Sequence, residues 1–245
     1  MSTPLARRAL AELVGTAFLV AAVMGSGIAA SRLSPDDVGL QLLENSLTTG
    51  AVLIALILAL QPVSAAFNPV VTLVERALGA VSTLDACVLL LAQFLGGAVG
   101  AVVANLMFDL DAVTISTHVR SGGGLWLGEV VATLGLLLVI FGTVRSGRGD
   151  TVAFAVGGYI TAAYWFTSST SFANPAVTAA RMLSDTFAGI APGSVAMFVL
   201  MQLIGGVLGY GLIRALYPRP EQLAAELAVP RPDTQPDSSE KEYSA

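Results

Sequence analysis

The stretch FANPAVT at residues 172–178 closely matches FNPVVT at residues 67–72. Both contain Asn-Pro, a pair that disrupts helix and strand and normally marks a turn at a protein surface. Both copies nevertheless lie in strongly apolar sequence, where a surface loop is not expected. The fold must therefore explain why the same break occurs twice.

Composition indicates a membrane protein. Of the 245 residues, 55% are hydrophobic and 12% are charged, whereas soluble domains are usually about 25% charged. Six blocks are nearly free of charge, and a helix of about 20 residues spans a bilayer. The fifth block reaches that length only if it continues through 167–171. We expect six transmembrane helices, at residues 9–31, 38–61, 86–108, 124–144, 152–166 and 195–217.

The distribution of arginine predicts the orientation. Six spans place both chain ends on one side of the membrane, and cytoplasmic loops carry an excess of Lys and Arg. The other side would carry only Arg32 and Arg120. Both termini are therefore expected to be cytoplasmic, in a plasma or inner membrane. The arginines on the terminal side are Arg7, Arg8, Arg145, Arg148, Arg214 and Arg219.

The C-terminal segment differs in composition from the rest of the chain. From Glu221 onward it has six acids and two bases and is rich in Pro and Ser. Such a segment cannot bury a core, so residues 219–245 are expected to be a disordered, acidic cytoplasmic tail. No basic cluster exceeds two residues, which argues against nucleic-acid binding. A single cysteine, Cys87, gives no basis for a disulfide or a cysteine metal site. No catalytic motif is present, so neither an enzyme nor a cofactor is expected.

An internal repeat organises residues 1–218. Glu12 and Glu129 lie in AELVGT and GEVVAT, and Gln93 and Gln202 lie in AQFLGG and MQLIGG. Together with the two Asn-Pro pairs, these matches recur in the same order at similar spacing. They indicate a duplication, with repeats at about 9–108 and 124–217. Each half contributes three spans, so the second half must be inverted in the membrane, as in many transport proteins.

The Asn-Pro pairs then fit two half-helices. Proline suits the first turn of a helix, and the segment from Pro69 to about Leu78 would be about 15 Å long, half of the bilayer core. Pro175 to about Ser184 gives the same length. Entering from opposite faces, the two would meet at their N-termini, which carry partial positive charge. This junction opposes cations but not neutral polar solutes. Asn68 and Asn174 would cap the half-helices and offer N–H donors to a solute.

From Glu12 to Tyr210 the sequence resembles the major intrinsic protein family, the aquaporins and aquaglyceroporins. The resemblance rests on the paired Asn-Pro, Glu-x-x-x-Thr and Gln-x-x-Gly motifs. It implies six tilted helices around a pore, two re-entrant half-helices, a homotetramer in the bilayer and passive flow of small neutral solutes. The implied pore motifs are Asn68, Pro69 and Val70, with Val in place of the usual Ala, and Asn174, Pro175 and Ala176.

The resemblance also implies a selectivity filter. The family usually carries Arg three residues after the second Asn, whereas this chain has Val177. Counting without gaps from the two Asn residues gives Thr48, Ala162 and Ser171 as the other filter positions. This set predicts a wide, weakly polar filter. Arg181 has two interpretations: a displaced filter arginine at the outer mouth, or a partner of Asp185, which we favour.

The expected function is a passive channel for small neutral solutes. The wide filter favours glycerol-like polyols, arsenous acid or related metalloid hydroxides, and water. In this respect the chain resembles atypical bacterial members that lack the filter arginine. Glu12 and Glu129 are expected to act as a scaffold for the loops. The alternatives are an ion-coupled secondary transporter that uses these two glutamates and a scaffold protein with a closed pore.

Overall fold

The computed structural model describes residues 3–228, and these residues form helices, turns and loops without a strand. The prediction of an all-α fold is confirmed. The long helices are α1 (Leu5–Leu33), α2 (Val38–Leu60), α4 (Thr83–Met107), α5 (Gly123–Arg145), α6 (Val152–Phe166) and α8 (Pro192–Leu216). The short elements are α3 (Pro69–Ala77), η1 (Gly149–Thr151), α7 (Pro175–Ala180), η2 (Arg181–Leu183) and α9 (Pro220–Ala228).

Five of the long helices have 23 to 29 residues and are apolar enough to cross a membrane, and α6 is shorter. Helix α6 has 15 residues and ends at Phe166, because the chain becomes extended at Thr167. The bounds agree with the expected block 152–166, and the helix does not continue through 167–171 to the usual spanning length. Those residues, a run of Ser and Thr, instead form the loop that leads into the second Asn-Pro pair.

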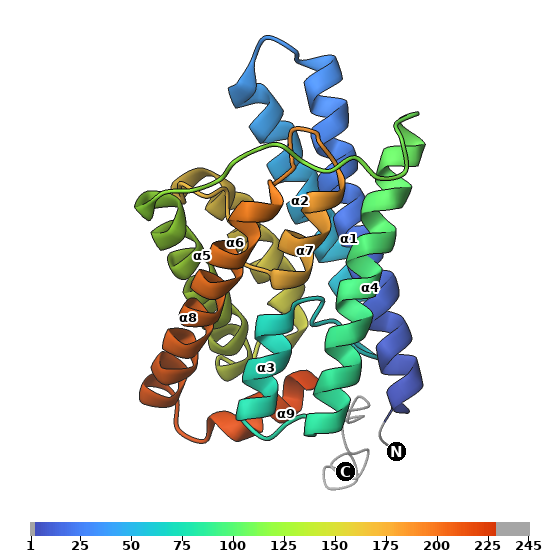
Figure 1. Cartoon of the computed structure of the whole chain (residues 1–245). Helices are drawn as coiled ribbons and strands as arrows, with labels where there is room; N and C mark the ends of the chain where they lie inside the picture. The colour runs from blue at the N-terminus through green and yellow to red at the C-terminus, as the bar shows by residue number, and fades with distance from the viewer. Residues whose placement is uncertain (1–2, 229–245) are drawn as a thin grey trace, which may run out of the picture.

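The two repeats are arranged around a shared centre. In the first, α1 packs against α2 and α4, and in the second α5 packs against α6 and α8. Helices α2 and α6 join the two halves. The short helices α3 and α7, one from each half, lie between α4 and α8 and contact both (Figure 1). The six long helices and the two short ones together surround the two Asn-Pro segments.

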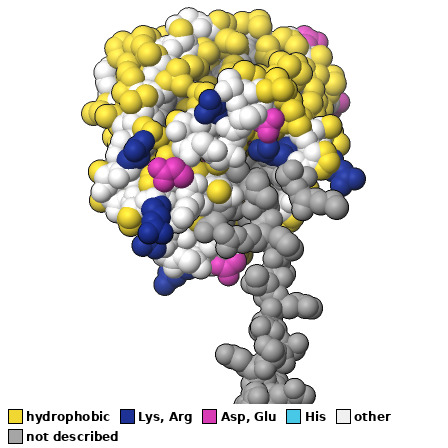
Figure 2. Space-filling view, turned by 90° about the horizontal axis from the view of Figure 1, so that it is seen from below, with side chains coloured by type: hydrophobic (Ala, Val, Ile, Leu, Met, Phe, Trp, Pro, Cys, Tyr) yellow, Lys and Arg dark blue, Asp and Glu magenta, His cyan; other side chains and the backbone are white. Residues whose placement is uncertain are grey.

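The outer surface suits a bilayer. Large apolar side chains are exposed along the long helices, for example Leu91 and Val99 on α4 and Val207 on α8. Figure 2 views the end of the molecule where α1 begins: charged side chains gather on this end face, and hydrophobic side chains occupy much of its rim. This division is expected for a protein whose sides contact lipid and whose ends contact water.

The C-terminal segment needs a correction. We expected disorder from residue 219, but residues 220–228 form helix α9, which packs against α5 and α3. Ala224 is completely buried in this contact. The remainder of the predicted tail, residues 229–245, lies outside the described residues. Helix α9 sits at the same end of the molecule as the start of α1 (Figure 1).

The contact between α1 and α4 should not tolerate a larger side chain at Gly96. A Cβ atom there would lie 2.3 Å from the carbonyl oxygen of Leu13, and overpacking typically costs about 1–3 kcal/mol. We expect Gly96→Ala to lower the thermal unfolding midpoint of the purified protein in detergent. Gly211→Ala is the matched control, because no atom lies within 4 Å of the added Cβ. Equal midpoints for the two variants would contradict this account of the packing.

Candidate functional site

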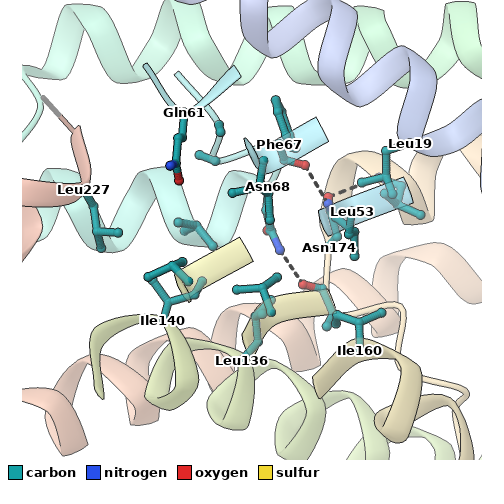
Figure 3. A pocket seen from close by; sticks show the side chains of 18 of the residues that line it. Leu19, Leu53, Gln61, Phe67, Asn68, Leu136, Ile140, Ile160, Asn174 and Leu227 are labelled. Carbon is teal, nitrogen blue, oxygen red and sulfur yellow. Dashed lines mark hydrogen bonds between the residues drawn. The ribbon is translucent and has the colours of Figure 1, made fainter. Parts of the chain in front are cut away.

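The two half-helices are joined by a reciprocal pair of hydrogen bonds. Asn68 Nδ2 donates to the carbonyl oxygen of Ala173 at 2.7 Å, and Asn174 Nδ2 donates to the carbonyl oxygen of Phe67 at 2.7 Å (Figure 3). Each Asn therefore reaches across to the loop that precedes the other. Because an amide nitrogen carries two hydrogens, each Asn keeps a second N–H.

The same two side chains cap their own helices. Asn68 Oδ1 accepts a hydrogen bond from the backbone N–H of Val70 at 2.9 Å. Asn174 Oδ1 accepts from Ala176 at 3.0 Å and from Val177 at 3.2 Å. Proline occupies the first helical position in both. The free N–H groups that begin α3 and α7 are thus partly satisfied, and both positive helix ends point at one junction.

Glu12 holds the loop that precedes α3. Its carboxylate accepts hydrogen bonds from Ser64 Oγ at 2.6 Å and from the backbone N–H groups of Ala66 and Phe67 at 2.8 and 2.7 Å. A fourth bond comes from Gln93 Nε2 at 2.8 Å. Glu12 is fully buried. Both of its carboxyl oxygens therefore have donors, which come from the loop and from α4.

Glu129 repeats this arrangement in the second half. It accepts from the backbone N–H groups of Phe172 and Ala173 at 3.0 and 2.9 Å, and from Gln202 Nε2 at 2.6 Å. The two glutamines also donate to hydroxyl groups on the half-helices, Gln93 to Thr72 and Gln202 to Thr178. The sequence reasoning missed these threonines. The signal was present, because each Thr follows its Asn by four residues.

Phe67 and Ala173, the residues just before the two Asn-Pro pairs, adopt a left-handed backbone with φ of 47° each. Such a conformation costs a non-glycine residue about 1–3 kcal/mol. In both, the backbone N–H is held by a buried glutamate and the carbonyl oxygen by the opposite Asn. The hydrogen bonds on both sides of each residue maintain the strained turn.

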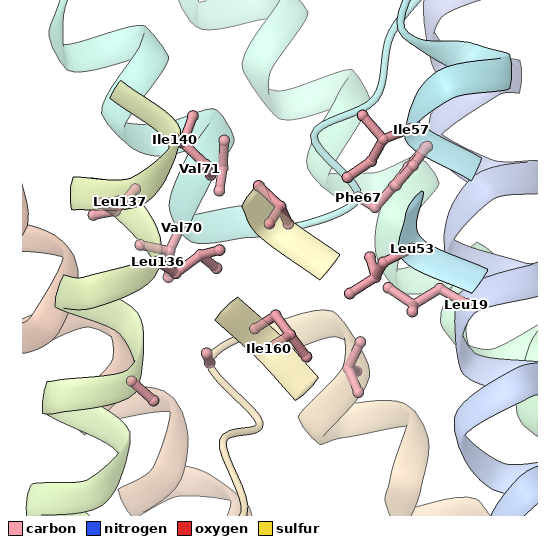
Figure 4. Packing of buried hydrophobic residues seen from close by; sticks show 14 of the residues in the cluster. Leu19, Leu53, Ile57, Phe67, Val70, Val71, Leu136, Leu137, Ile140 and Ile160 are labelled. Carbon is pink, nitrogen blue, oxygen red and sulfur yellow. The ribbon is translucent and has the colours of Figure 1, made fainter. Parts of the chain in front are cut away.

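A cavity of about 750 Å³ runs past the junction, and both Asn side chains line it. Ser64 to Phe67 and Ser171 to Ala173 also line it and bring polar groups. The opposite wall is apolar and is formed by α2, α5 and α6 (Figures 3 and 4). A small solute with both apolar and hydrogen-bonding surface would match these walls. The apolar wall comprises Leu53, Ile57, Leu136, Ile140, Val156 and Ile160.

Beyond the junction, the cavity continues on the α7 side. Thr49, Tyr164, Ser171 and Val177 line it. The hydroxyl oxygens of Thr49 and Tyr164 lie 3.1 Å apart and share a hydrogen bond. This region thus combines hydroxyl groups with the apolar side chain of Val177.

Two of the filter positions expected from the sequence need correction. Thr48 and Ala162 are exposed and do not line the cavity, and the Thr48 hydroxyl donates to the Glu44 carbonyl. The cause is the close contact between α2 and α6, where a Cβ on Gly157 would lie 2.6 Å from the Gly50 carbonyl oxygen. This contact sets the rotation of both helices and turns Thr49 and Tyr164 inward.

Arg181 lies on the wall of the same region. It is buried, its Nε donates to the carbonyl oxygen of Ala188, and its guanidinium carbon lies 3.4 Å from the ring centroid of Phe172. The favoured pairing with Asp185 is wrong, since no such ion pair occurs within residues 3–228. Asp185 is exposed and accepts from the backbone N–H and hydroxyl of Thr117, which lower the pKa of its carboxyl group.

The described residues contain no group of three His, Cys, Asp or Glu side chains that could hold a metal ion. The site instead has the features of a path for a solute. It is a cavity with hydrogen-bond donors at its centre and with one polar and one apolar wall.

Comparison with known proteins gives the family. The family model described as "Major intrinsic protein" matches residues 1–168 and 147–236. The chain is 47% identical over 213 residues to Aquaglyceroporin AqpS of Rhizobium meliloti, covering 86% of this chain and 91% of that protein. It is 29% identical over 231 residues to Aquaporin Z of Photorhabdus laumondii, covering 86% and 97%.

A solved structure shares the fold. The aquaglyceroporin from Plasmodium falciparum superimposes with a TM-score of 0.69 at 18% sequence identity, over 90% of this chain and 100% of that one. The arrangement of long helices and half-helices is therefore the aquaporin-like fold. The chain belongs to the major intrinsic protein family, which is a family of membrane channels and not of enzymes.

Proposed function

We propose that this protein is a passive channel for small neutral solutes: glycerol-like polyols, undissociated metalloid hydroxides such as arsenous acid, and water. The observation that carries the proposal is the cavity onto which Asn68 and Asn174 project, where the N-termini of α3 and α7 meet. Two positive helix ends at one point oppose a cation but leave N–H donors for a neutral oxygen. The relative named an aquaglyceroporin supports solutes larger than water.

We assign the outer filter to Thr49, Tyr164, Ser171 and Val177. Val177 lines the cavity at the position where the family usually has Arg. An apolar side chain there leaves a wider and less polar opening than a guanidinium would. Arg181, four residues further along at the start of η2, is assigned to the outer mouth, where its buried guanidinium lines the cavity. A filter of this kind favours solutes that carry hydroxyl groups.

Glu12 and Glu129 fit a scaffold and not a relay for ions. Both are fully buried, both accept several hydrogen bonds, and neither is among the residues that line the cavity. A coupled transporter would need these carboxyl groups to meet the transported ion. The open cavity beside the Asn pair likewise argues against a scaffold protein with a closed pore.

The placement in the membrane is also part of the proposal. The bias of arginine toward the end where α1 begins supports cytoplasmic termini in a plasma or inner membrane. The many exposed apolar side chains support contact with lipid and with other subunits of a homotetramer. Each subunit would carry its own pore, because the cavity is lined within one chain.

The test of this function is solute flux in proteoliposomes. Stopped-flow light scattering should record glycerol and water permeability well above that of protein-free liposomes. Uptake of arsenous acid should likewise be faster into liposomes that contain the protein. The fluxes should not change when a proton or sodium gradient is imposed. Absence of flux for every neutral solute would refute the channel, and dependence on a gradient would favour the coupled transporter.

Val177→Arg should narrow the filter. A guanidinium at this position would add bulk and donors one turn nearer the junction than Arg181. We expect glycerol permeability to fall on the order of tenfold and water permeability to fall much less. Thr48→Val is the control, since Thr48 does not line the cavity. Equal losses of glycerol and water flux in Val177→Arg would refute the filter assignment.

Glu12→Gln should weaken the scaffold. The amide nitrogen would face N–H donors, and a buried backbone N–H left without an acceptor costs about 1–3 kcal/mol. We expect a lower thermal midpoint and a parallel loss of glycerol and water flux, compared with the exposed control Asp36→Asn. A variant of normal stability that loses only gradient-driven uptake would instead support the coupled transporter.

A further inference from the structure

The repeat places a second matched pair of polar side chains along the cavity. Glu75 follows Asn68 by seven residues, and Arg181 follows Asn174 by the same number. Both are buried and both line the cavity. They lie on the same face of their half-helices as the Asn residues, because positions seven apart are two helical turns from each other. Glu75 is thus the counterpart of Arg181 in the first repeat.

Glu75 faces what we call the inner end of the cavity, lined by Arg8, Gln61, Asp150 and Leu227. The Glu75 side chain is 6% exposed. Within the described part of the chain, no side chain or backbone group donates a hydrogen bond to its carboxyl group. Glu75 differs in this from Glu12, whose carboxyl group accepts four hydrogen bonds.

Arg8 brings a donor to the same place. Its Nη1 pairs with Asp85 Oδ2 at 3.1 Å, but its Nε is buried and has no partner among residues 3–228. Arg8 and Glu75 do not form an ion pair within 4 Å of each other in this part of the chain. A donor and an acceptor therefore line one end of the cavity without satisfying each other.

Stability does not explain an acid at this position. Glu75 lies in the last turns of α3, where the partial negative charge of the helix end disfavours a carboxylate. Buried polar groups normally have a hydrogen-bond partner, and acids within membrane proteins are functional candidates. Because Glu75 lines the cavity, a hydroxyl group of a ligand there can donate to its carboxyl group.

We propose that Glu75 and Arg8 form a second solute-binding position at the inner end, for a neutral solute with two or more hydroxyl groups. One hydroxyl donates to the Glu75 carboxyl group, and another oxygen accepts from the guanidinium group of Arg8, which also lines the cavity. Polyols and metalloid hydroxides share this chemistry. The proposal rests on the function proposed above and adds a specificity-determining contact that lies on the opposite side of the junction from the outer filter.

Two substitutions at Glu75 test the contact. Glu75→Leu keeps the approximate size of the side chain but removes its ability to form hydrogen bonds. Glu75→Gln keeps both the size and the ability to form hydrogen bonds. We expect Glu75→Leu to lower glycerol permeability about fivefold or more with little change for water, and Glu75→Gln to stay near the wild type. Arg76→Gln, at the exposed neighbouring position, should change neither flux. Unchanged glycerol flux in Glu75→Leu, or equal losses of glycerol and water flux, would overturn the proposal.

A cysteine variant gives an independent measurement. Cys87 is the single cysteine and is exposed, so Cys87→Ser provides a cysteine-free background. In that background, Glu75→Cys should react with a water-soluble methanethiosulfonate reagent, and glycerol should slow the reaction. No reaction, or no protection by glycerol, would overturn the proposal. Wild-type liposomes that pass no glycerol would instead refute the channel function itself.

Discussion

The pore depends on hydrogen bonds that a broken helix needs inside a membrane. Where α3 and α7 begin, the backbone has no helical partners, and unpaired N–H and carbonyl groups are costly in the absence of water. Glu12 and Glu129 accept from the loops, and Asn68 and Asn174 satisfy the carbonyl groups that the strained turns expose. The polar backbone can therefore line a path at the centre of an apolar protein.

This network sets strict limits on the surrounding helices. Glu12 on α1 must reach the loop before α3 while Gln93 on α4 reaches both Glu12 and Thr72. Such an arrangement requires α1 and α4 to approach closely, and Gly96 permits it. The second repeat solves the same problem with Gly205, whose Cβ would meet the backbone of Val130. The small residues thus let the helices approach closely enough for the buried glutamates to accept hydrogen bonds from the loops.

The sequence predicted the elements whose pattern is local. Asn-Pro identified the half-helices, and the paired glutamates and glutamines identified the repeat. It did not predict which faces of α2 and α6 line the cavity, because the contact between Gly50 and Gly157 sets their rotation. It also missed α9, since the burial of Ala224 depends on a surface that α5 and α3 create together. Arg181 was ambiguous for the same reason: its neighbour in space is Phe172, not Asp185.

The two repeats differ in the charged residues that line the cavity. The scaffold positions are the same in both halves, since Glu12 matches Glu129 and Gln93 matches Gln202. At the seventh residue after each Asn, by contrast, one half has an acid and the other a base. A scaffold residue must keep its hydrogen-bond partners in both halves, whereas a residue on the cavity wall also faces the cavity and can differ between the halves. The side of the cavity formed with α3 therefore carries an acid, Glu75, close to Arg8, whereas the side formed with α7 carries the base Arg181.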